Sequence, residues 1–352
     1  MSIKITGTGS IIPKIKENNS AFYNHIFYDI NGNLINLDNK EIIKKFKSIT
    51  GIENRRYINS NQKSSDIAIE ASKIAIKDSG IDKEDIDYII LAHNIGDITS
   101  NSNQVDTLPS LASRVKAGLK IINPSCVAYD ILFGCPGWIE GVIQAAAFIK
   151  AKMAKKCLVI GSDTLSRVLD KSDRDSMIYA DGAGATIIEN CNQKGGILSH
   201  KTATYSSNDE INYIYYGNAN NKIDDKTKYI KMQGRKVYEF ALNHVPMAMK
   251  ECVDNSNVSI EKIKKIFIHQ ANQKMDEEII KRFYKLFNKK MPNDVLPMNI
   301  KDFGNSSVAT IPTLYDLTKK KNYNDHHINN GDHILFASVG AGMNINALTY
   351  QL

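Results

Sequence analysis

The chain has 352 residues, of which 42% are hydrophobic and 24% are charged, a mixture typical of a folded globular protein. The 45 Lys and Arg residues outnumber the 38 Asp and Glu residues only modestly, and no basic stripe with interleaved aromatics predicts nucleic-acid binding. No apolar run is long enough to span a membrane, and residues 1–20 lack the pattern of a secretory signal, so we expect a cytoplasmic protein.

Cysteine and histidine spacing argues against a metal site. None of the cysteines forms a C-x-x-C pair, and no histidine cluster has the spacing of a zinc site. An odd, scattered set of thiols is typical of a reducing compartment. The five cysteines are Cys126, Cys135, Cys157, Cys191 and Cys252.

Short apolar runs alternate with amphipathic stretches of helical length along the chain. In chain order, strands are predicted over Ile86–Ala92, Val127–Phe133, Cys157–Ile160 and Ile263–Ile268. Helices are predicted over Ser64–Ser79, Trp138–Lys152, Asp276–Phe287 and Val308–Lys319. The alternation predicts an α/β fold in which helices cover the sheets. The polar segments 18–39 and 208–228 are expected to be surface loops.

Two segments in the two halves of the chain echo each other. Glu84–Leu91 and Glu261–Ile268 place apolar residues at the same positions, and each follows a polar turn. We therefore predict a duplicated α/β architecture with a boundary near residue 193. The N-terminal half would span residues 1–193 and the C-terminal half residues 194–352.

Cys135 has the setting of a reactive cysteine. It lies between a predicted strand and a helix expected to begin at Pro136, where proline is well tolerated. The positive end of that helix dipole would stabilise a thiolate, and Gly134 and Gly137 would permit a sharp turn. A small, buried structural cysteine is the alternative. The local pattern alone leaves both interpretations open.

His269 and Asn305 also lie where α/β proteins place catalytic groups. His269 follows a predicted strand and opens the turn His-Gln-Ala-Asn, and Asn305 lies in the turn Phe303–Ser307 before a predicted helix. A lone histidine is more often structural, and an Asn beside glycine often only forms a turn. The joint occurrence of Cys135, His269 and Asn305 favours an active site.

This set of motifs resembles the β-ketoacyl-[acyl-carrier-protein] synthase III family of the thiolase superfamily. The motifs run through nearly the whole chain: Ile5–Ser10, Thr50–Ile52 with Arg55 and Arg56, the Cys135 turn, Gly161–Asp163, Asp181–Ala185, His269–Asn272, Gly304–Ser306 and Gly340–Gly342. The resemblance implies a thiolase-like fold, whose duplicated α/β halves form a layered α-β-α-β-α architecture. It also implies a homodimer joined through a continuous sheet.

The resemblance implies roles for residues at matching positions. Cys135 would accept an acyl group from a thioester, while its backbone N–H and that of Ala341 or Gly342 hold the oxyanion. His269 and Asn305 would donate hydrogen bonds to the thioester oxygen of a malonyl or β-ketoacyl group as it loses CO₂ and attacks the acyl group. No metal or other cofactor is implied. The thioester substrates would be malonyl-ACP and either acyl-CoA or acyl-ACP, and the resemblance leaves that donor open.

The implied partner is an acyl carrier protein. The family docks this acidic protein at positions that correspond to Lys274, Lys281 and Arg282, with Arg235 and Lys236 as possible additions. Arg174 and Asn272 would contact the pantetheine arm or the substrate. A solvated helix face is the alternative for the first three, and Glu239 stands where the family often has a lysine.

Some features depart from the family pattern. Members that use CoA have a Trp and an Arg around the adenine, where this chain has Lys45 and Ile49. The segment 18–39 and the stretch Asp97–Asp106 are also longer than expected. These departures favour a specialised ketosynthase of secondary metabolism as an alternative. Such an enzyme would make a dialkylresorcinol or aryl polyene, or would couple long acyl chains.

Four further interpretations are less consistent with the sequence. A degradative thiolase needs a second cysteine, which Ser338–Asn346 lacks, and the His-Gln-Ala-Asn turn disfavours a type III polyketide synthase. A papain-like protease would need a different motif around its cysteine. A non-catalytic partner subunit of a ketosynthase commonly loses one catalytic residue, whereas Cys135, His269 and Asn305 are all present.

Overall fold

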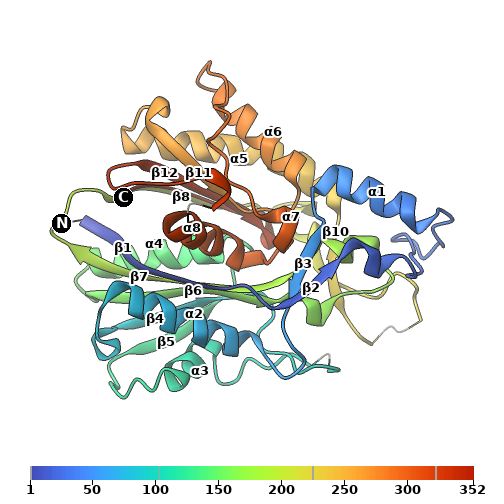
Figure 1. Cartoon of the computed structure of the whole chain (residues 1–352), viewed down its shortest axis with the longest axis horizontal. Helices are drawn as coiled ribbons and strands as arrows, with labels where there is room; N and C mark the ends of the chain where they lie inside the picture. The colour runs from blue at the N-terminus through green and yellow to red at the C-terminus, as the bar shows by residue number, and fades with distance from the viewer. Residues whose placement is uncertain (1, 103, 224–225, 322) are drawn as a thin grey trace.

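Two β-sheets form the framework of the computed structural model, which describes residues 2–102, 104–223, 226–321 and 323–352 (Figure 1). The five-stranded sheet has the order β1 (Ser2–Ile11), β7 (Asp181–Cys191), β6 (Lys156–Thr164), β4 (Tyr88–Ala92) and β5 (Val127–Ile131). The four-stranded sheet has the order β11 (Ile263–Ile268), β12 (His333–Gly340), β13 (Asn344–Gln351) and β8 (Gly196–Thr204).

Helices lie outside and between the two sheets (Figure 1). The first sheet is covered by α2 (Ser64–Ser79) and α3 (Leu111–Gly118), and the second by α5 (Gly234–Ser256) and α6 (Gln273–Lys285). Between the sheets lie α4 (Gly137–Lys150) and α8 (Thr310–Lys321), each in contact with both. The predicted α-β-α-β-α architecture is confirmed.

The layer between the sheets is apolar. Trp138 of α4 is buried and packs edge-on against Phe336 of β12, with ring centroids 5.5 Å apart. Tyr315 of α8 packs against Phe336 and Phe267 at 5.3 and 5.5 Å. These large side chains fix the positions of the two central helices, and the connections that precede those helices carry Cys135 and Asn305, two of the three candidate catalytic residues.

The two sheets repeat one strand pattern. Along β1-β7-β6-β4 the neighbours are antiparallel, antiparallel and parallel, and β8-β13-β12-β11 follows the same sequence. The echoing segments Glu84–Leu91 and Glu261–Ile268 lead into β4 and β11, which occupy equivalent places, so the predicted duplication is confirmed. The chain passes from β7 to β8 between Cys191 and Gly196. The division into residues 1–193 and 194–352 stays our proposal.

Most predicted elements agree with the structure to within a few residues. The predicted helix Ser64–Ser79 coincides with α2, and Gly80, in the left-handed conformation, caps the end of this helix. The predicted loop 208–228 differs, because it contains β9 (Ile214–Gly217), which pairs with β10 (Tyr229–Met232). Isoleucine and tyrosine side chains suit a strand, and the polar residues around them concealed this signal.

The segment 18–39 builds a small core of its own. Phe22 and Phe27 are 5% and 1% exposed, and they pack with Ile42 and Ile43 of α1 (Asn39–Thr50). The segment therefore serves as an apolar support for α1 as well as a surface loop. No helix in the described part of the chain is long and apolar enough to cross a membrane.

Candidate active site

Cys135 lies in the tight connection between β5 and α4. Gly134 adopts a positive φ of 67°, and α4 begins one residue later than predicted, with Pro136 as its N-cap. The connection packs against the end of β12. A Cβ atom on Gly340 would lie 2.4 Å from the Cys135 nitrogen, and one on Gly134 would lie 2.6 Å from the Ala341 nitrogen. Only glycine permits this close approach.

The Cys135 thiol is held in its neutral form by its surroundings. Burial raises the pKa of the thiol to about 12, whereas a hydrogen bond from Ser307 lowers it. The Ser307 Oγ atom lies 3.5 Å from the Cys135 Sγ atom. The start of α4 also favours negative charge on the sulfur. Thiolate formation therefore depends on the donors around Sγ.

Ser307 connects the three candidate catalytic residues. Besides its contact with Cys135, its backbone N–H donates to the Asn305 Oδ1 atom at 2.8 Å. The Ser307 backbone also raises the pKa of the His269 ring, so these two residues lie beside each other. The structure thus brings Cys135, His269 and Asn305 together, although they are far apart in sequence.

His269 is a neutral histidine at physiological pH. Its side chain is 5% exposed, and burial lowers its pKa to about 4, partly opposed by the Ser307 backbone. The backbone N–H of His269 donates to the Ala337 oxygen at 2.9 Å, which fixes the residue at the end of β11. Its Nδ1 atom is buried without a partner among the described residues. A neutral ring can donate a hydrogen bond to a developing oxyanion.

Asn305 is fixed by its own backbone. Its N–H donates to the Ile178 oxygen at 3.0 Å, and its carbonyl accepts from the Ala180 N–H at 2.8 Å. Because the Oδ1 atom accepts from Ser307, the amide nitrogen of the side chain is the end left to face a substrate.

Two polar residues that the sequence did not single out for catalysis, one half-buried and one buried, support this group. Asn94 donates from Nδ2 to Ser307 Oγ at 2.7 Å and to Asp163 Oδ2 at 2.7 Å. Asp163 is fully buried, and burial raises its pKa. Asn94 follows the predicted strand Ile86–Ala92 closely, and a polar residue just after a buried strand was the available signal.

The backbone of Ala341 and Gly342 borders the Cys135 connection. These residues begin the short helix η9 (Ala341–Met343), and Gly342 has a φ of 76°. Asn344 donates from Nδ2 to the Ala341 and Phe133 oxygens at 2.9 and 3.3 Å. It thereby ties η9 to the connection. The predicted oxyanion role of these backbone N–H groups stays a prediction.

Three predicted binding residues line one hollow of about 500 Å³. They are Arg174, Arg235 and Lys236, which the sequence had assigned to substrate contact and carrier-protein docking. Arg235 pairs with Glu239 at 2.8 Å and Lys236 with Asp209 at 3.4 Å, so both cations already have acidic partners. Arg174 is 56% exposed at its side chain.

The remaining predicted binding residues lie on or beside α6. Asn272 caps the helix, because its side chain accepts the Met275 N–H at 3.1 Å. Arg282 pairs with Glu278 at 3.0 Å and donates to the Leu242 oxygen at 3.3 Å, which joins α6 to α5. These two residues therefore have structural roles, and their binding roles stay predictions.

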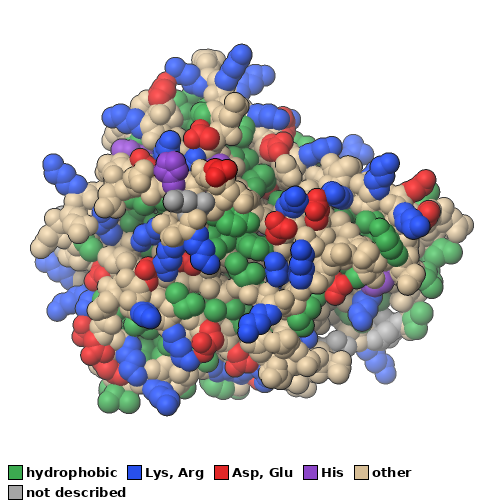
Figure 2. All heavy atoms as spheres, viewed as in Figure 1, with side chains coloured by type: hydrophobic (Ala, Val, Ile, Leu, Met, Phe, Trp, Pro, Cys, Tyr) green, Lys and Arg blue, Asp and Glu red, His purple; other side chains and the backbone are tan. Residues whose placement is uncertain are grey.

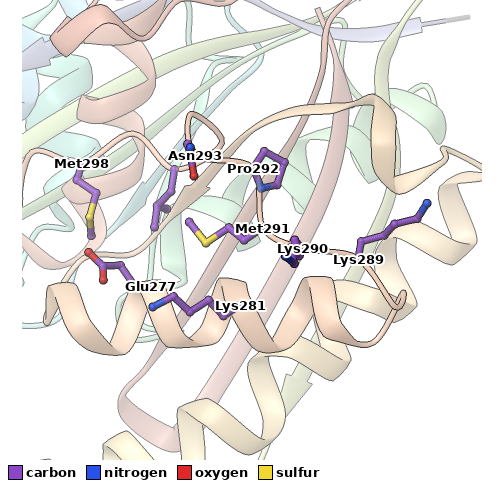
Figure 3. Close-up of a pocket in the computed structure, with 9 residues that line it drawn as sticks. Glu277, Lys281, Lys289, Lys290, Met291, Pro292, Asn293 and Met298 are labelled. Carbon is purple, nitrogen blue, oxygen red and sulfur yellow. The ribbon is translucent and has the colours of Figure 1, made fainter.

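Lys274 and Lys281 are exposed on α6, and within the described residues neither has a carboxylate at ion-pair distance. Lys281 also borders a hollow of about 510 Å³ between α6 and the loop that follows it (Figure 3). In this view the sulfur-containing side chains of Met291 and Met298 lie across from α6. Over the face shown in Figure 2, Lys and Arg side chains are interspersed with acidic ones and form no single block.

Comparison with protein-family models identifies the family of this chain. The model of 3-oxoacyl-[acyl-carrier-protein (ACP)] synthase III matches residues 129–206, and the model of its C-terminal part matches residues 253–352. The chain belongs to this synthase III family. The matched regions contain all three of Cys135, His269 and Asn305.

Relatives extend the match over the whole chain. The β-ketoacyl-[acyl-carrier-protein] synthase III of Ehrlichia ruminantium (strain Gardel) is 31% identical, over 97% of this chain and 96% of the relative. That of Porphyra purpurea is 30% identical, over 100% and 99%. The crystal structure of the Aquifex aeolicus enzyme superposes with a TM-score of 0.80 at 27% identity, covering 99% and 100% of the two chains.

Membership of the synthase III family confirms the resemblance read from the motifs. It makes the chain an acyltransferase of the condensing type, as predicted. Within the described residues, no group of three or more His, Cys, Asp and Glu side chains is arranged to hold a metal ion.

Proposed function

We propose that this synthase III joins an acyl group carried on Cys135 to the malonyl group of a malonyl-ACP. The observation that carries the proposal is the meeting of Cys135, His269 and Asn305 around the single residue Ser307. This arrangement supplies one nucleophile and two neutral donors. They are the groups that acyl transfer and decarboxylation require.

The first step is transfer of the acyl group to Cys135. The Sγ atom attacks the carbonyl carbon of the donor thioester, and a new carbon–sulfur bond forms as the bond to the donor thiol breaks. The proton of Cys135 leaves with the departing thiol. Between these two events, the backbone N–H of Cys135 and that of Ala341 or Gly342 hold the negative oxygen of the tetrahedral intermediate.

The second step is decarboxylative condensation. His269 and the Nδ2 atom of Asn305 donate hydrogen bonds to the thioester oxygen of the malonyl group, which becomes an enolate as CO₂ leaves. The carbanion attacks the acyl carbon, and the bond to Cys135 Sγ breaks. The low pKa of His269, about 4, supports this role because the ring is neutral at the working pH.

We infer that the substrate arm enters past the hollow lined by Arg174, Arg235 and Lys236. Asn272 would also contact this arm. The carrier protein would dock beside it on α6 through Lys274, Lys281 and Arg282. The two lysines support this part of the proposal best, since no carboxylate in the described structure neutralises them.

We also propose a homodimer joined along β5. This strand is the edge of the five-stranded sheet, and none of its residues is fully buried. Val127 on the strand and Leu132 just beyond it are 47% and 71% exposed, and Leu108 is 89% exposed. An open edge flanked by apolar side chains favours pairing with a second copy of the sheet. We expect the dimer to be cytoplasmic.

A specialised ketosynthase of secondary metabolism is the second candidate. Lys45 and Ile49 are both exposed on α1, where CoA-using relatives are expected to hold the adenine. A donor acyl group on a carrier protein suits this surface better than acyl-CoA. A non-catalytic partner subunit is the third candidate, although the assembled site argues against it.

Intact-protein mass spectrometry distinguishes these candidates. The enzyme is incubated with matched acyl-CoA and acyl-ACP thioesters of several chain lengths, with Cys135→Ala as the control. An acyl adduct on the wild type alone supports the nucleophile, and the preferred donor identifies the substrate class. A folded protein that takes no adduct from any donor would contradict the proposal and favour the non-catalytic subunit.

A further inference from the structure

The hydroxyl group of Ser307 is oriented by its neighbours. Its Oγ atom accepts a hydrogen bond from Asn94 Nδ2 at 2.7 Å and lies 3.5 Å from Cys135 Sγ. An amide nitrogen can only donate, so the hydroxyl proton of Ser307 is not used toward Asn94. The proton therefore has two acceptors within reach, the Cys135 sulfur and the Asp163 carboxylate, whose pKa a hydrogen bond from the Ser307 side chain lowers.

Asn94 is itself fixed by a buried carboxyl group. Its backbone N–H donates to Asp163 Oδ1 at 2.8 Å, and its side chain donates to Asp163 Oδ2 at 2.7 Å. These two bonds determine which way the amide of Asn94 faces. The direction of donation then runs from Asn94 to Ser307 and from Ser307 to Cys135.

The backbone of Ser307 is held in an unusual conformation. Its φ is 55°, which non-glycine residues rarely adopt, and the bond from its N–H to Asn305 holds it there. Such conformations cluster at functional sites, where surrounding contacts maintain them. Here the conformation places the hydroxyl group beside the nucleophile.

Few other groups act on the sulfur. Asp163 from β6 raises the pKa of the Cys135 thiol. Cys135 in turn raises the pKa of Tyr179, which lies just before β7. Ser307 is the side chain in the described structure that donates to Sγ.

We propose that Ser307 is a catalytic residue of the acyl-transfer step, in which its hydroxyl group donates a hydrogen bond to the Cys135 thiolate. Asn94 and Asp163 are positioning residues that act through it. Ser307 keeps its own proton throughout, since the thiol proton leaves with the departing thiol. The inference rests on the proposed function, in which Cys135 is the nucleophile.

Alkylation of Cys135 by iodoacetamide tests the inference without any acyl substrate. The rate is measured against pH by mass spectrometry for the wild type, Ser307→Ala and Asn94→Ala. A hydrogen bond to a charged sulfur is worth about one pKa unit or more, so Ser307→Ala should react about tenfold more slowly at a fixed pH. Asn94→Ala should also react more slowly than the wild type, but by a smaller factor than Ser307→Ala.

The matched control is Ser306→Ala, which removes a neighbouring hydroxyl group that contacts Thr310 at 3.5 Å. This variant should keep the wild-type profile, and circular dichroism should show all variants folded. Equal profiles for wild type and Ser307→Ala would overturn the inference.

The same experiment separates the inference from the proposed function. Cys135→Ala identifies the labelled site. A slower reaction in Ser307→Ala together with no acyl adduct from any thioester would refute the proposed function and leave the thiol contact supported. Acylation of the wild type together with an unchanged profile in Ser307→Ala would refute only the role of Ser307.

Discussion

The burial of His269 predicts a specific loss of stability in acid. In the folded protein its pKa is lowered from the usual 6.5 to about 4 by burial. Below pH 6.5 the unfolded chain therefore binds a proton that the folded chain resists. Stability must fall as the pH falls from 6.5 towards 4, and below that range the two states are equally protonated at this residue.

The size of this effect follows from the two pKa values. At about pH 4.5 the proton on the unfolded chain favours unfolding by about 2.5 kcal/mol, and at neutral pH the effect is close to zero. Replacing His269 with glutamine removes the titration and keeps a side chain that donates hydrogen bonds. The acid sensitivity of the variant should therefore be smaller than that of the wild type by about 2.5 kcal/mol.

Urea denaturation of both proteins at neutral pH and near pH 4.5 measures the difference. Other titrating groups contribute equally to both proteins and cancel in the comparison. In parallel, the ring protons of His269 in NMR spectra, assigned through the variant, should titrate near pH 4. Equal acid sensitivity in the two proteins, or titration near pH 6.5, would refute a buried neutral donor.

Three further predictions concern packing, a buried ion cluster and docking. Gly340→Ala would place a Cβ atom 2.4 Å from the Cys135 nitrogen, so acyl transfer should fall about tenfold or more and stability by about 1–3 kcal/mol. Gly234→Ala, whose nearest neighbour would be 3.8 Å away, is the control, and unchanged activity in both would contradict the packing argument. Lys231 is 4% exposed and bonds two carboxylates. Lys231→Met should therefore lower the free energy of unfolding, measured by urea denaturation, by about 3–5 kcal/mol. An unchanged free energy of unfolding would mean that the cluster does not stabilise the fold. Lys281→Glu should raise KM for malonyl-ACP severalfold at low salt and less at high salt, with acylation by acyl-CoA unchanged as the control. An equal KM would place docking elsewhere.

The candidate catalytic residues could be proposed from the sequence because a local signal marks each of them and the three signals occur together. Cys135 lies between glycines at a strand-to-helix connection, His269 ends an apolar strand, and Asn305 follows a glycine. Each signal depends on neighbouring residues only. The bounds of α2 were predictable for the same reason, since Gly80 ends that helix.

The supporting contacts could not be predicted, because they join residues far apart in sequence. The bond between Asn94 and Ser307 spans 213 positions and exists only once the two sheets are stacked. The burial of Lys231 likewise depends on Asp170 and Asp173, which belong to a different part of the chain. A lysine within a polar segment gives no local sign that it is buried.

The hairpin formed by β9 and β10 was missed for a related reason. Its apolar residues are few and lie among many Asn, Asp and Lys residues, so the segment resembles a loop. In the structure β9 contacts η9 beside Cys135, and Lys231 anchors β10. The hairpin therefore borders the site, although its sequence gave no indication of this role.

A single-turnover experiment tests carbon–carbon bond formation most directly. The enzyme is first acylated on Cys135 by its preferred donor, freed of excess donor and then mixed with malonyl-ACP. The proposed function predicts that the acyl mass leaves Cys135 as CO₂ is released, and that the carrier protein then bears the corresponding β-ketoacyl group. Return of the acyl group to the carrier protein without loss of CO₂, or an acyl-enzyme that malonyl-ACP leaves unchanged, would contradict it.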